Sequence, residues 1–528
     1  MRRVVLRPYV DLRDIRRRLF YLAIFPALFL FCLIYGFFFA LTAPYLIVAF
    51  SVPVVTLALL GIWALPELRA VPTTLMRFLF SGYIVTLILW PNYLALALPG
   101  LPWITPARLT GFPLVFCLLI CVSTSKPFKA RLAEIFGSTP FVWKALAVFV
   151  AMQFLTILLS KQPATSFSKT LVMQVNWTTM FIMSAFVFAK PGRLQRYIPL
   201  ICLMSVPIAA VAALEYKEQH LLWDGHIPSF LKVDDIDHLM KPEFRLGTNT
   251  YRAKATFSTA LGLAEYMAIL TPFFLHYAVT ARQMVTKLSS WLMIAVMYAT
   301  IYFSGSRLGY MGMMVSALLY LLLWALLRWR RLRSDLLAPA LVVSYPLFFL
   351  AVMGGSFFIH RIHVIVWGGG AQAGSNQARM NQIGMAWPNF IKNPIGHGTG
   401  MSGDAMGYGA GRFVTIDNYM ISTALDYGAI GLVAYYAMFI GGIVYAFMYI
   451  WNYLGKSRDP ETGYIIPISI SVAAFLVIKF VFSQQDLDPL LFILLGMIVA
   501  VVHRLDVERK QLAADVGRGA AIPLRRVV

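Results

Sequence analysis

Fourteen apolar stretches, each near the length that crosses a lipid bilayer, dominate this sequence of 528 residues. A membrane-spanning helix needs about 20 mostly apolar residues. Charged residues make up 13% of the chain, against about 25% in a soluble domain. The stretches lie at about 20–41, 43–64, 76–99, 109–124, 141–160, 168–189, 195–214, 259–279, 289–304, 308–327, 338–356, 428–451, 464–482 and 488–503. The sequence predicts an all-α polytopic integral membrane protein with about 14 transmembrane helices, or 12 if the short fourth and ninth stretches are re-entrant.

The positive charges indicate the orientation of these helices. With the N-terminus in the cytoplasm, the inner segments include "KPFKAR", "KPGRLQR", "ARQMVTK" and "RWRRLR" and hold most of the 45 Lys and Arg residues. Cytoplasmic loops carry this excess in membrane proteins, which also explains the net charge of +22 without a nucleic-acid partner. We therefore predict a multi-pass membrane protein with both termini in the cytoplasm. Its basic N-terminal segment is interpreted as leading into a retained first helix.

Two long loops interrupt an otherwise short set of connections. They run over 215–258 and 357–427, and the predicted orientation places both on the outer side of the membrane. Long loops are more often functional than short ones. The whole sequence, 1–528, is interpreted as one multi-span membrane domain. The four cysteines lie in apolar stretches and are interpreted as small buried side chains.

Three arginines are predicted on the periplasmic side, where the orientation rule gives them no reason to be. Arg252 lies in "YRAKATFSTALGLAEY", Arg307 in "SGSRLGYMG", and Arg379 in "NQARMNQIGMAWPNF". Arginine presents a rigid fork of donors that suits phosphate groups. The alternative for each is a side chain that snorkels at the bilayer interface. This alternative is weakest for Arg307, because small residues beside it would let a ligand approach the backbone.

Two further motifs lie in the second long loop and at its end. "NPIGHGTG" (393–400) has the Pro and Gly content of a constrained turn, and its His397 is either a titrating group or a solvated side chain. "TIDNYM" places Asp417 and Asn418 at the entry to an apolar stretch, ten residues before Gly428 in the case of Asn418. Both residue types are preferred helix caps, and capping does not exclude a catalytic role.

Together these motifs resemble the bacterial O-antigen ligase and polymerase superfamily. The resemblance covers about 250–445 and rests on the order of four features: the first Arg and its Phe-containing turn, "SGSR", "R…W…NPIGHGTG", and "DNY" with its following Gly and "IGL". It implies a metal-independent, cofactor-free inverting glycosyltransferase of the bacterial inner membrane that takes glycan from an undecaprenyl diphosphate carrier at the periplasmic face, with both long loops in the periplasm. Ligases of the family usually carry a His just before the Asn, where this chain has Ile416 and Asp417. That difference favours polymerisation of O-antigen or exopolysaccharide over ligation to lipid A-core.

The resemblance also assigns roles to individual residues. It implies that Arg252, Arg307 and Arg379 bind the diphosphate, with Arg307, Asp417 and Asn418 as catalytic residues. Asp417 would be the general base toward the acceptor hydroxyl, and preorganised arginines would stabilise the leaving group. Lys254 and His397 are accessory candidates. The implied partners are the carrier-linked oligosaccharide, an acceptor glycan or lipid A-core, membrane lipids, a chain-length regulator and export proteins.

Other readings remain open at this point. A flippase or transporter would place polar groups along its spans, and a scaffold subunit of an export machine would tolerate loss of the arginines. "DLD" (Asp486, Asp488) is interpreted as structural or acceptor-facing, and "HRIH" (His360, His363) lacks a third ligand for a metal site. Lys479 either pairs with Asp486 or snorkels.

Overall fold

The structure is a computed structural model. It describes residues 26–27, 29–38, 47–65, 67, 71–96, 104–233, 240–244, 249–359, 363, 373–407, 416, 418–480 and 485–517. The chain divides into two compact units. Residues 1–64 with 98–102 form the first, whose described part holds the helix Phe29–Phe38 and α2 (Ile47–Trp63). Residues 65–97 with 103–528 form the second, which contains the candidate site.

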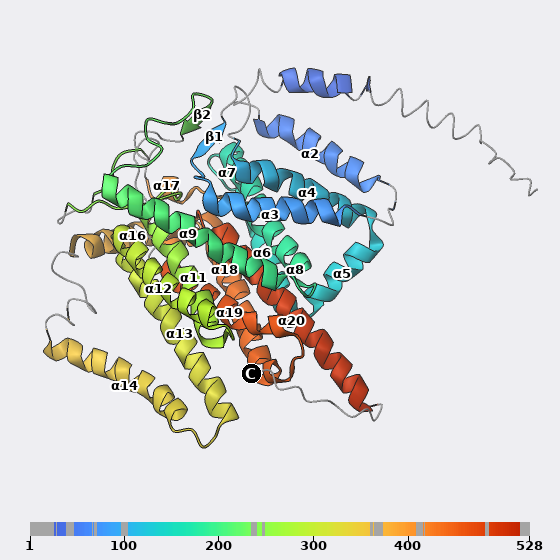
Figure 1. Cartoon of the computed structure of the whole chain (residues 1–528). Helices are drawn as coiled ribbons and strands as arrows, with labels where there is room; N and C mark the ends of the chain where they lie inside the picture. Colours follow the sequence, from blue (N-terminus) through green and yellow to red (C-terminus); the bar gives the residue numbers. More distant parts are fainter. Residues whose placement is uncertain are drawn as a thin grey trace, which may run out of the picture. The chain divides into compact units, whose positions relative to one another are not determined.

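The second unit is built almost entirely from helices (Figure 1). Its first half contains α3 (Thr73–Leu89), α4 (Pro106–Thr124), α5 (Lys126–Gly137), α6 (Pro140–Ile157), α7 (Pro163–Met173), the π-helix Gln174–Thr179, α8 (Met180–Phe188) and α9 (Leu194–Glu218). Its second half contains α11 (Ala260–Thr280), α12 (Met284–Phe303), α13 (Arg307–Arg331), α14 (Leu337–Phe358), α16 (Ala373–Lys392), α17 (Ser402–Ala405), α18 (Tyr419–Asn452), α19 (Ile465–Lys479) and α20 (Asp488–Gly517). Short 3-10 turns cover Leu454–Lys456 and Pro460–Tyr464.

The prediction of an all-α polytopic membrane protein is confirmed. Each of the fourteen apolar stretches overlaps a helix among the described residues, although the third continues past α3 into β1 (Leu94–Leu96), and ten helices there are long and apolar enough to cross a membrane. The short fourth and ninth stretches belong to α4 and α12, which have 19 and 20 residues. Each is longer than its apolar run because the helix begins earlier, for α4 at a Thr105 side chain that accepts from the Arg108 amide. Both therefore reach spanning length.

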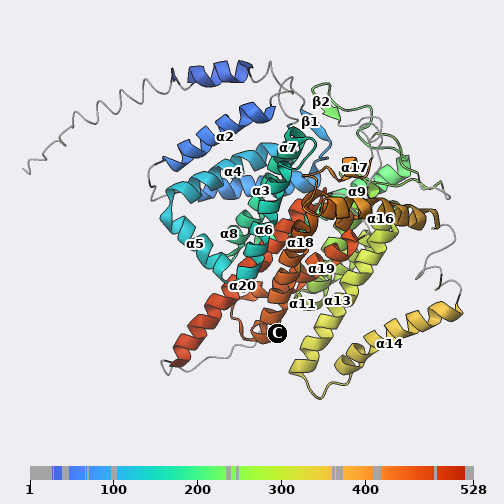
Figure 2. The ribbon, with the colours of Figure 1, turned by 180° about the vertical axis from the view of Figure 1, so that it is seen from behind.

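The helices differ in how much of their surface is covered. The spanning window of α20 is 94% buried, because this helix is apolar all round and lies inside the bundle. The window of α14 is 6% buried, and this helix lies at the edge of the bundle beside α13 (Figures 1 and 2). In a membrane protein an exposed apolar helix faces lipid, so the burial pattern separates interior spans from peripheral ones.

The two long loops carry ordered structure. The first contains β2 (Leu231–Val233), which pairs antiparallel with β1 (Leu94–Leu96) from the connection after α3. The second contains α16, a helix of 20 residues that the sequence analysis treated as loop. It has no long apolar run, so hydropathy gave no signal for it. These loop elements lie together with α17 at the upper end of the bundle in Figure 1.

We call this end the site end, defined by the first turns of α11, α13, α18 and α20. The opposite end has its own buried ionic contacts. There Arg504 of α20 donates to Glu461 at 2.7 Å, and Glu461 also accepts from the backbone amides of Gly192 and Gln195. The contacts at each end join segments that the charge pattern assigns to one side of the membrane. Which side is periplasmic stays a prediction.

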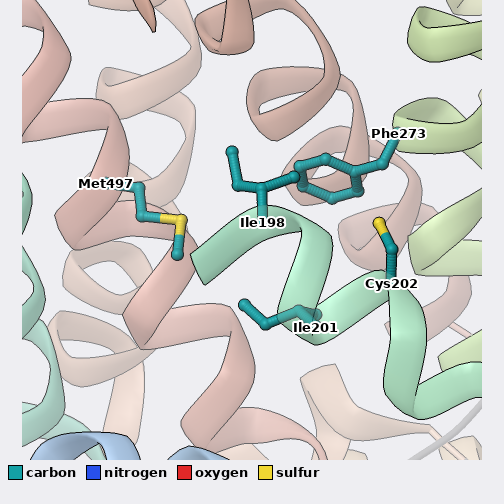
Figure 3. A pocket seen from close by; sticks show the side chains of 5 residues that line it. All are labelled: Ile198, Ile201, Cys202, Phe273 and Met497. Atoms are coloured by element: carbon teal, nitrogen blue, oxygen red, sulfur yellow. The ribbon is translucent and has the colours of Figure 1, made fainter. Parts of the chain in front are cut away.

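The interior of the bundle is closely packed. Figure 3 shows a gap of about 10 Å³ among Ile198, Ile201, Cys202, Phe273 and Met497, from α9, α11 and α20. This volume is at the limit for a single water molecule, and the lining is apolar. The gap is therefore a packing defect rather than a ligand site.

Candidate functional site

Arg252 and Arg307 are brought together at the turn between α12 and α13. The Arg252 Nε donates to the carbonyl of Ser304 at 3.1 Å, and the Ala253 amide donates to the carbonyl of Phe303 at 2.9 Å. A Cβ added to Gly305 would lie 3.3 Å from the Arg252 Cγ. Two residues farther along, Arg307 begins α13 with an exposed side chain. Arg252 thus packs on the turn that leads into Arg307, which brings the backbones of two of the three predicted phosphate-binding arginines close together.

The turn that presents Arg307 is set by small residues. Gly305 has a φ of +59°, a conformation that glycine adopts without a steric penalty. Ser306 caps α13 by accepting from the Gly309 amide at 3.3 Å. Arg307 therefore occupies the first turn of a helix, where unpaired amides and the helix dipole favour a nearby anion.

Arg252 is more constrained than Arg307. One of its Nη atoms pairs with Glu243 in the first long loop, and the Arg252 amide donates to the Glu243 carbonyl at 2.9 Å. This pairing excludes free snorkelling for Arg252. An incoming diphosphate would have to share the guanidinium with Glu243.

Glu215, at the end of α9, fixes the segment that carries Arg252. Its buried carboxylate accepts from the Tyr251 hydroxyl at 2.9 Å and from the amides of Lys254 and Ala255 at 3.1 and 2.7 Å. Lys254, the accessory candidate, is itself buried, and burial lowers the pKa of its ammonium. Lys254 therefore belongs to the scaffold beneath Arg252 as much as to any binding surface. The sequence analysis missed Glu215, although an acid at the end of an apolar stretch was a signal.

The "NPIGHGTG" loop packs against a break in α18. Gly428 interrupts this helix with φ +70° and ψ −172°, and the next residue, Ala429, donates its amide to the Pro394 carbonyl at 2.9 Å. A Cβ on Gly428 would lie 2.3 Å from the Pro394 and Ile395 carbonyl oxygens. Gly428, ten residues after Asn418, therefore has to be a glycine, because the "NPIGHGTG" loop occupies the space that a side chain would need.

The same loop is held by the turn of α18 before the break. The Gly398 amide donates to the carbonyl of Asp426 at 3.1 Å, and the buried Asp426 carboxylate accepts from the Ser402 amide at 2.7 Å. Gly396, Gly398 and Gly400 all have positive φ, so the constrained turn predicted from this motif is confirmed. Asp426 was not recognised in the sequence.

His397 is fixed by the α18 backbone. Its amide donates to the Leu425 carbonyl at 2.8 Å, and its Nδ1 lies 3.0 Å from the same oxygen. A carbonyl oxygen only accepts, so Nδ1 carries a hydrogen. In the neutral ring Nε2 is then the acceptor nitrogen.

Asn418 caps α18, as one of the two readings predicted. Its Oδ1 accepts from the Met420 and Ile421 amides at 2.9 and 3.4 Å. Asp417 lies outside the described residues, so its catalytic role stays a prediction. Arg379 lies on α16, and its side chain is likewise outside the description.

Replacing Asn418 by Ala should lower the free energy of unfolding by about 1 kcal/mol, because two amides of the first turn lose their acceptor. Asn418→Ser should keep most of the cap. Thermal denaturation of the purified chain measures both changes. If the Ala variant melts like the wild type but the Ser variant is impaired in function, capping is not the main task of Asn418.

A buried ionic cluster lies beneath the first turn of α18. The Lys479 ammonium is 3.1 Å from Asp488 and 3.6 Å from Glu265, and all three side chains are at most 1% exposed. The Tyr419 hydroxyl donates to Asp488 at 2.8 Å, and its ring lies 5.1 Å from the Lys479 ammonium. The interpretation of Lys479 as a snorkelling residue is wrong, because carboxylates on α11 and α20 compensate its charge inside the bundle.

The "DLD" acids belong to this buried region. Asp486 accepts from the amide of Ser258 at 3.3 Å and from its hydroxyl, which ties the start of α20 to the segment before α11. Burial raises the pKa of the Asp486 carboxyl, and the Ser258 bonds oppose that shift. The structural reading of Asp486 and Asp488 therefore fits their surroundings. The sequence analysis considered Lys479 but missed Glu265, whose position inside an apolar stretch was the available signal.

The described part of the chain contains no group of three His, Cys, Asp or Glu side chains arranged to hold a metal ion. In "HRIH", His363 directs Nδ1 to the Ser356 carbonyl at 3.1 Å, while His360 lies outside the described residues. At the Ser304–Ser306 turn, arginine side chains and the first turn of α13 supply positive charge. They suit an anionic ligand.

Comparison with known proteins gives one family. Residues 292–436 match the family model described as O-antigen ligase. A search of curated proteins finds no match to the chain. The matched range includes Arg307, Arg379, His397 and the first part of α18, and it leaves Arg252 outside. The family resemblance inferred from the motifs is confirmed.

Proposed function

We propose that this membrane protein, whose residues 292–436 match the family model described as O-antigen ligase, transfers glycan from an undecaprenyl diphosphate carrier to an acceptor at the periplasmic face. The observation that carries the proposal is the convergence of Arg252 and Arg307 on the Ser304–Ser306 turn. Departure of the carrier leaves negative charge on the diphosphate. Two guanidinium groups and the first turn of α13 supply positive potential at that place.

The chemistry we propose is a single displacement with inversion at the anomeric carbon. Asp417 takes the proton from the acceptor hydroxyl as that oxygen attacks, and the bond to the diphosphate breaks toward the arginines. The Asn418 cap fixes the backbone next to Asp417. The arginines stabilise the leaving group in place of a divalent metal ion. Arg379 joins them from α16.

We assign the acceptor to another carrier-linked repeat unit, so that the reaction is polymerisation. The support is the Asp417 side chain at the position where ligases of the family usually have His. The partners are then the lipid carrier, the growing glycan, a chain-length regulator and export proteins. Ligation to lipid A-core is the alternative within the same chemistry.

One observation favours a different class of function. Glu265, Lys479 and Asp488 are ionisable groups buried among spanning helices, as in transporters of charged or polar cargo. A flippase for lipid-linked oligosaccharides is therefore the second candidate. The cluster's close pairing favours a structural role over a transport path.

Glycan analysis of a deletion strain separates these functions. Polymerase loss should leave single repeat units on the carrier, accessible from the periplasm. Ligase loss should leave long chains on the carrier, and flippase loss should leave units on the cytoplasmic side. The last outcome would contradict a glycosyltransferase.

Arg307→Ala, returned to the deletion strain, should lower glycan transfer about 10²–10³-fold while the chain still inserts and folds, because a preorganised cation is lost. Glycan transfer by Arg307→Lys should lie between that of the wild type and that of Arg307→Ala, since lysine keeps the charge but not the fork of donors. Arg282→Ala removes an exposed arginine after α11 and is the matched control. Normal polymer in the Arg307→Ala strain would refute the proposed role.

A further inference from the structure

A cavity lined by both apolar and polar side chains lies between the turn after α6 and the loop after α16. Its volume is about 230 Å³, and it is lined by Leu159, Lys161, Asn393, His397, Met401, Asp404 and Ala405. The arginine pair does not line it. This cavity is therefore a feature separate from the diphosphate surface proposed above.

Contacts between distant segments hold the walls of the cavity in place. Lys169 of α7 donates to the Gly400 carbonyl at 2.9 Å, and the hydroxyls of Thr170 and Thr399 lie 2.6 Å apart. Gln162 donates to the Asp404 carboxylate at 3.1 Å. The positive φ angles of the "NPIGHGTG" glycines let the loop pass close to α7, where a Cβ on Gly400 would meet the Lys169 side chain at 2.5 Å. The walls of the cavity are thus held by contacts between segments that lie far apart in the sequence.

The polar lining presents mainly acceptors. His397 directs Nδ1–H to Leu425, which leaves Nε2 as the acceptor in the neutral ring. The Asn393 amide nitrogen donates to the Gly396 carbonyl at 2.7 Å, which fixes its Oδ1 as the acceptor for a ligand. Asp404 accepts from Gln162 through Oδ2 and retains Oδ1. Lys161 adds a donor group to the same lining.

The character of the lining decides the class of ligand. The formal charges of Lys161 and Asp404 cancel, so the cavity does not favour a phosphate. Several acceptors, one donor group and the apolar side chains of Leu159 and Met401 match a ring with hydroxyl groups around its rim and C–H groups on its faces. The volume is below the range of about 300–1,000 Å³ of sites for drug-sized ligands, which indicates one ring.

We propose that this cavity binds one sugar ring of the glycan, with His397 Nε2, Asn393 Oδ1 and Asp404 Oδ1 accepting bonds from its hydroxyl groups. The inference rests on the proposed function for the source of the sugar. It adds a glycan subsite to the diphosphate surface and gives His397 a specific task.

The test measures binding without transfer. The probe is the free oligosaccharide released by mild acid from carrier lipids of the deletion strain, added to the purified full chain in lipid nanodiscs. Saturation-transfer NMR should show contact concentrated on one ring. Ala405→Phe, which fills the cavity without changing charge, should abolish this signal. His397→Asn keeps a donor near Leu425 but loses Nε2, and it should weaken binding about ten-fold.

Arg307→Ala distinguishes failure of the subsite from failure of the proposed function. It should bind the free oligosaccharide like the wild type and fail in transfer. Wild-type-like binding by Ala405→Phe would overturn the subsite and leave the transferase proposal intact. Binding that depends on the cavity, in a chain whose deletion leaves polymer unchanged, would uphold the subsite and overturn the transferase.

Discussion

Lys479→Met should lower the free energy of unfolding by about 3–5 kcal/mol, because it leaves buried carboxylates without their cation. Lys479 is fully buried between Asp488 and Glu265, and methionine fills similar space without charge. Thermal denaturation in detergent and the fraction of monodisperse protein in size-exclusion chromatography measure the loss.

The matched control removes the whole charge set. Lys479→Met combined with Glu265→Gln and Asp488→Asn should recover most of the stability, since no buried charge is then unpaired. Tyr419 can still donate to the amide oxygen at position 488. A single variant that melts with the wild type, or a triple variant no better than the single one, would show that unpaired buried charge is not what destabilises the Lys479→Met variant.

Gly428→Ala has the second large expected effect. The Gly428 backbone lies in a region that is essentially restricted to glycine, and the new methyl would lie 2.3 Å from the Pro394 carbonyl oxygen. Strain and overpacking together should cost about 3 kcal/mol or more. We expect a lower melting temperature and loss of glycan transfer, because the loop that carries His397 must move away.

Gly384→Ala is the control for this change. Gly384 lies in α16 with nothing within 4 Å of an added Cβ, so alanine should be neutral or stabilise the helix by up to about 1 kcal/mol. Equal melting temperatures for the two variants would mean that the contact between α18 and the loop does not constrain residue 428.

Hydropathy predicted the spanning helices because lipid selects for apolar length, a property of each segment alone. It did not reveal α16, because this helix mixes apolar and polar residues and has no long apolar run. Nor did it show that Glu265 and Lys479, more than 200 residues apart, share one ion pair. Such a contact depends on how the helices pack, and a single sequence records only that two ionisable residues lie in apolar segments.

The candidate site was also predictable only in part, because some of its contacts depend on how distant segments pack. The predicted orientation placed Arg252 and Arg307 on one side of the membrane, and in the structure Arg252 donates to the carbonyl of Ser304, in the turn that leads into Arg307. The spacing from Asn418 to Gly428 was visible in the sequence. Its cause was not, because the Pro394 carbonyl that occupies the space of a side chain comes from another loop. Asp417 remains a prediction from its motif.

The Glu265–Lys479 pair also has a consequence for biogenesis. During synthesis α11 is made long before α19, so Glu265 enters the membrane without its cationic partner. Until α19 arrives, the carboxyl must be held protonated or in contact with water, since an isolated buried charge is costly. Formation of this ion pair therefore has to wait until α19 has entered the membrane, which makes it a late step of assembly.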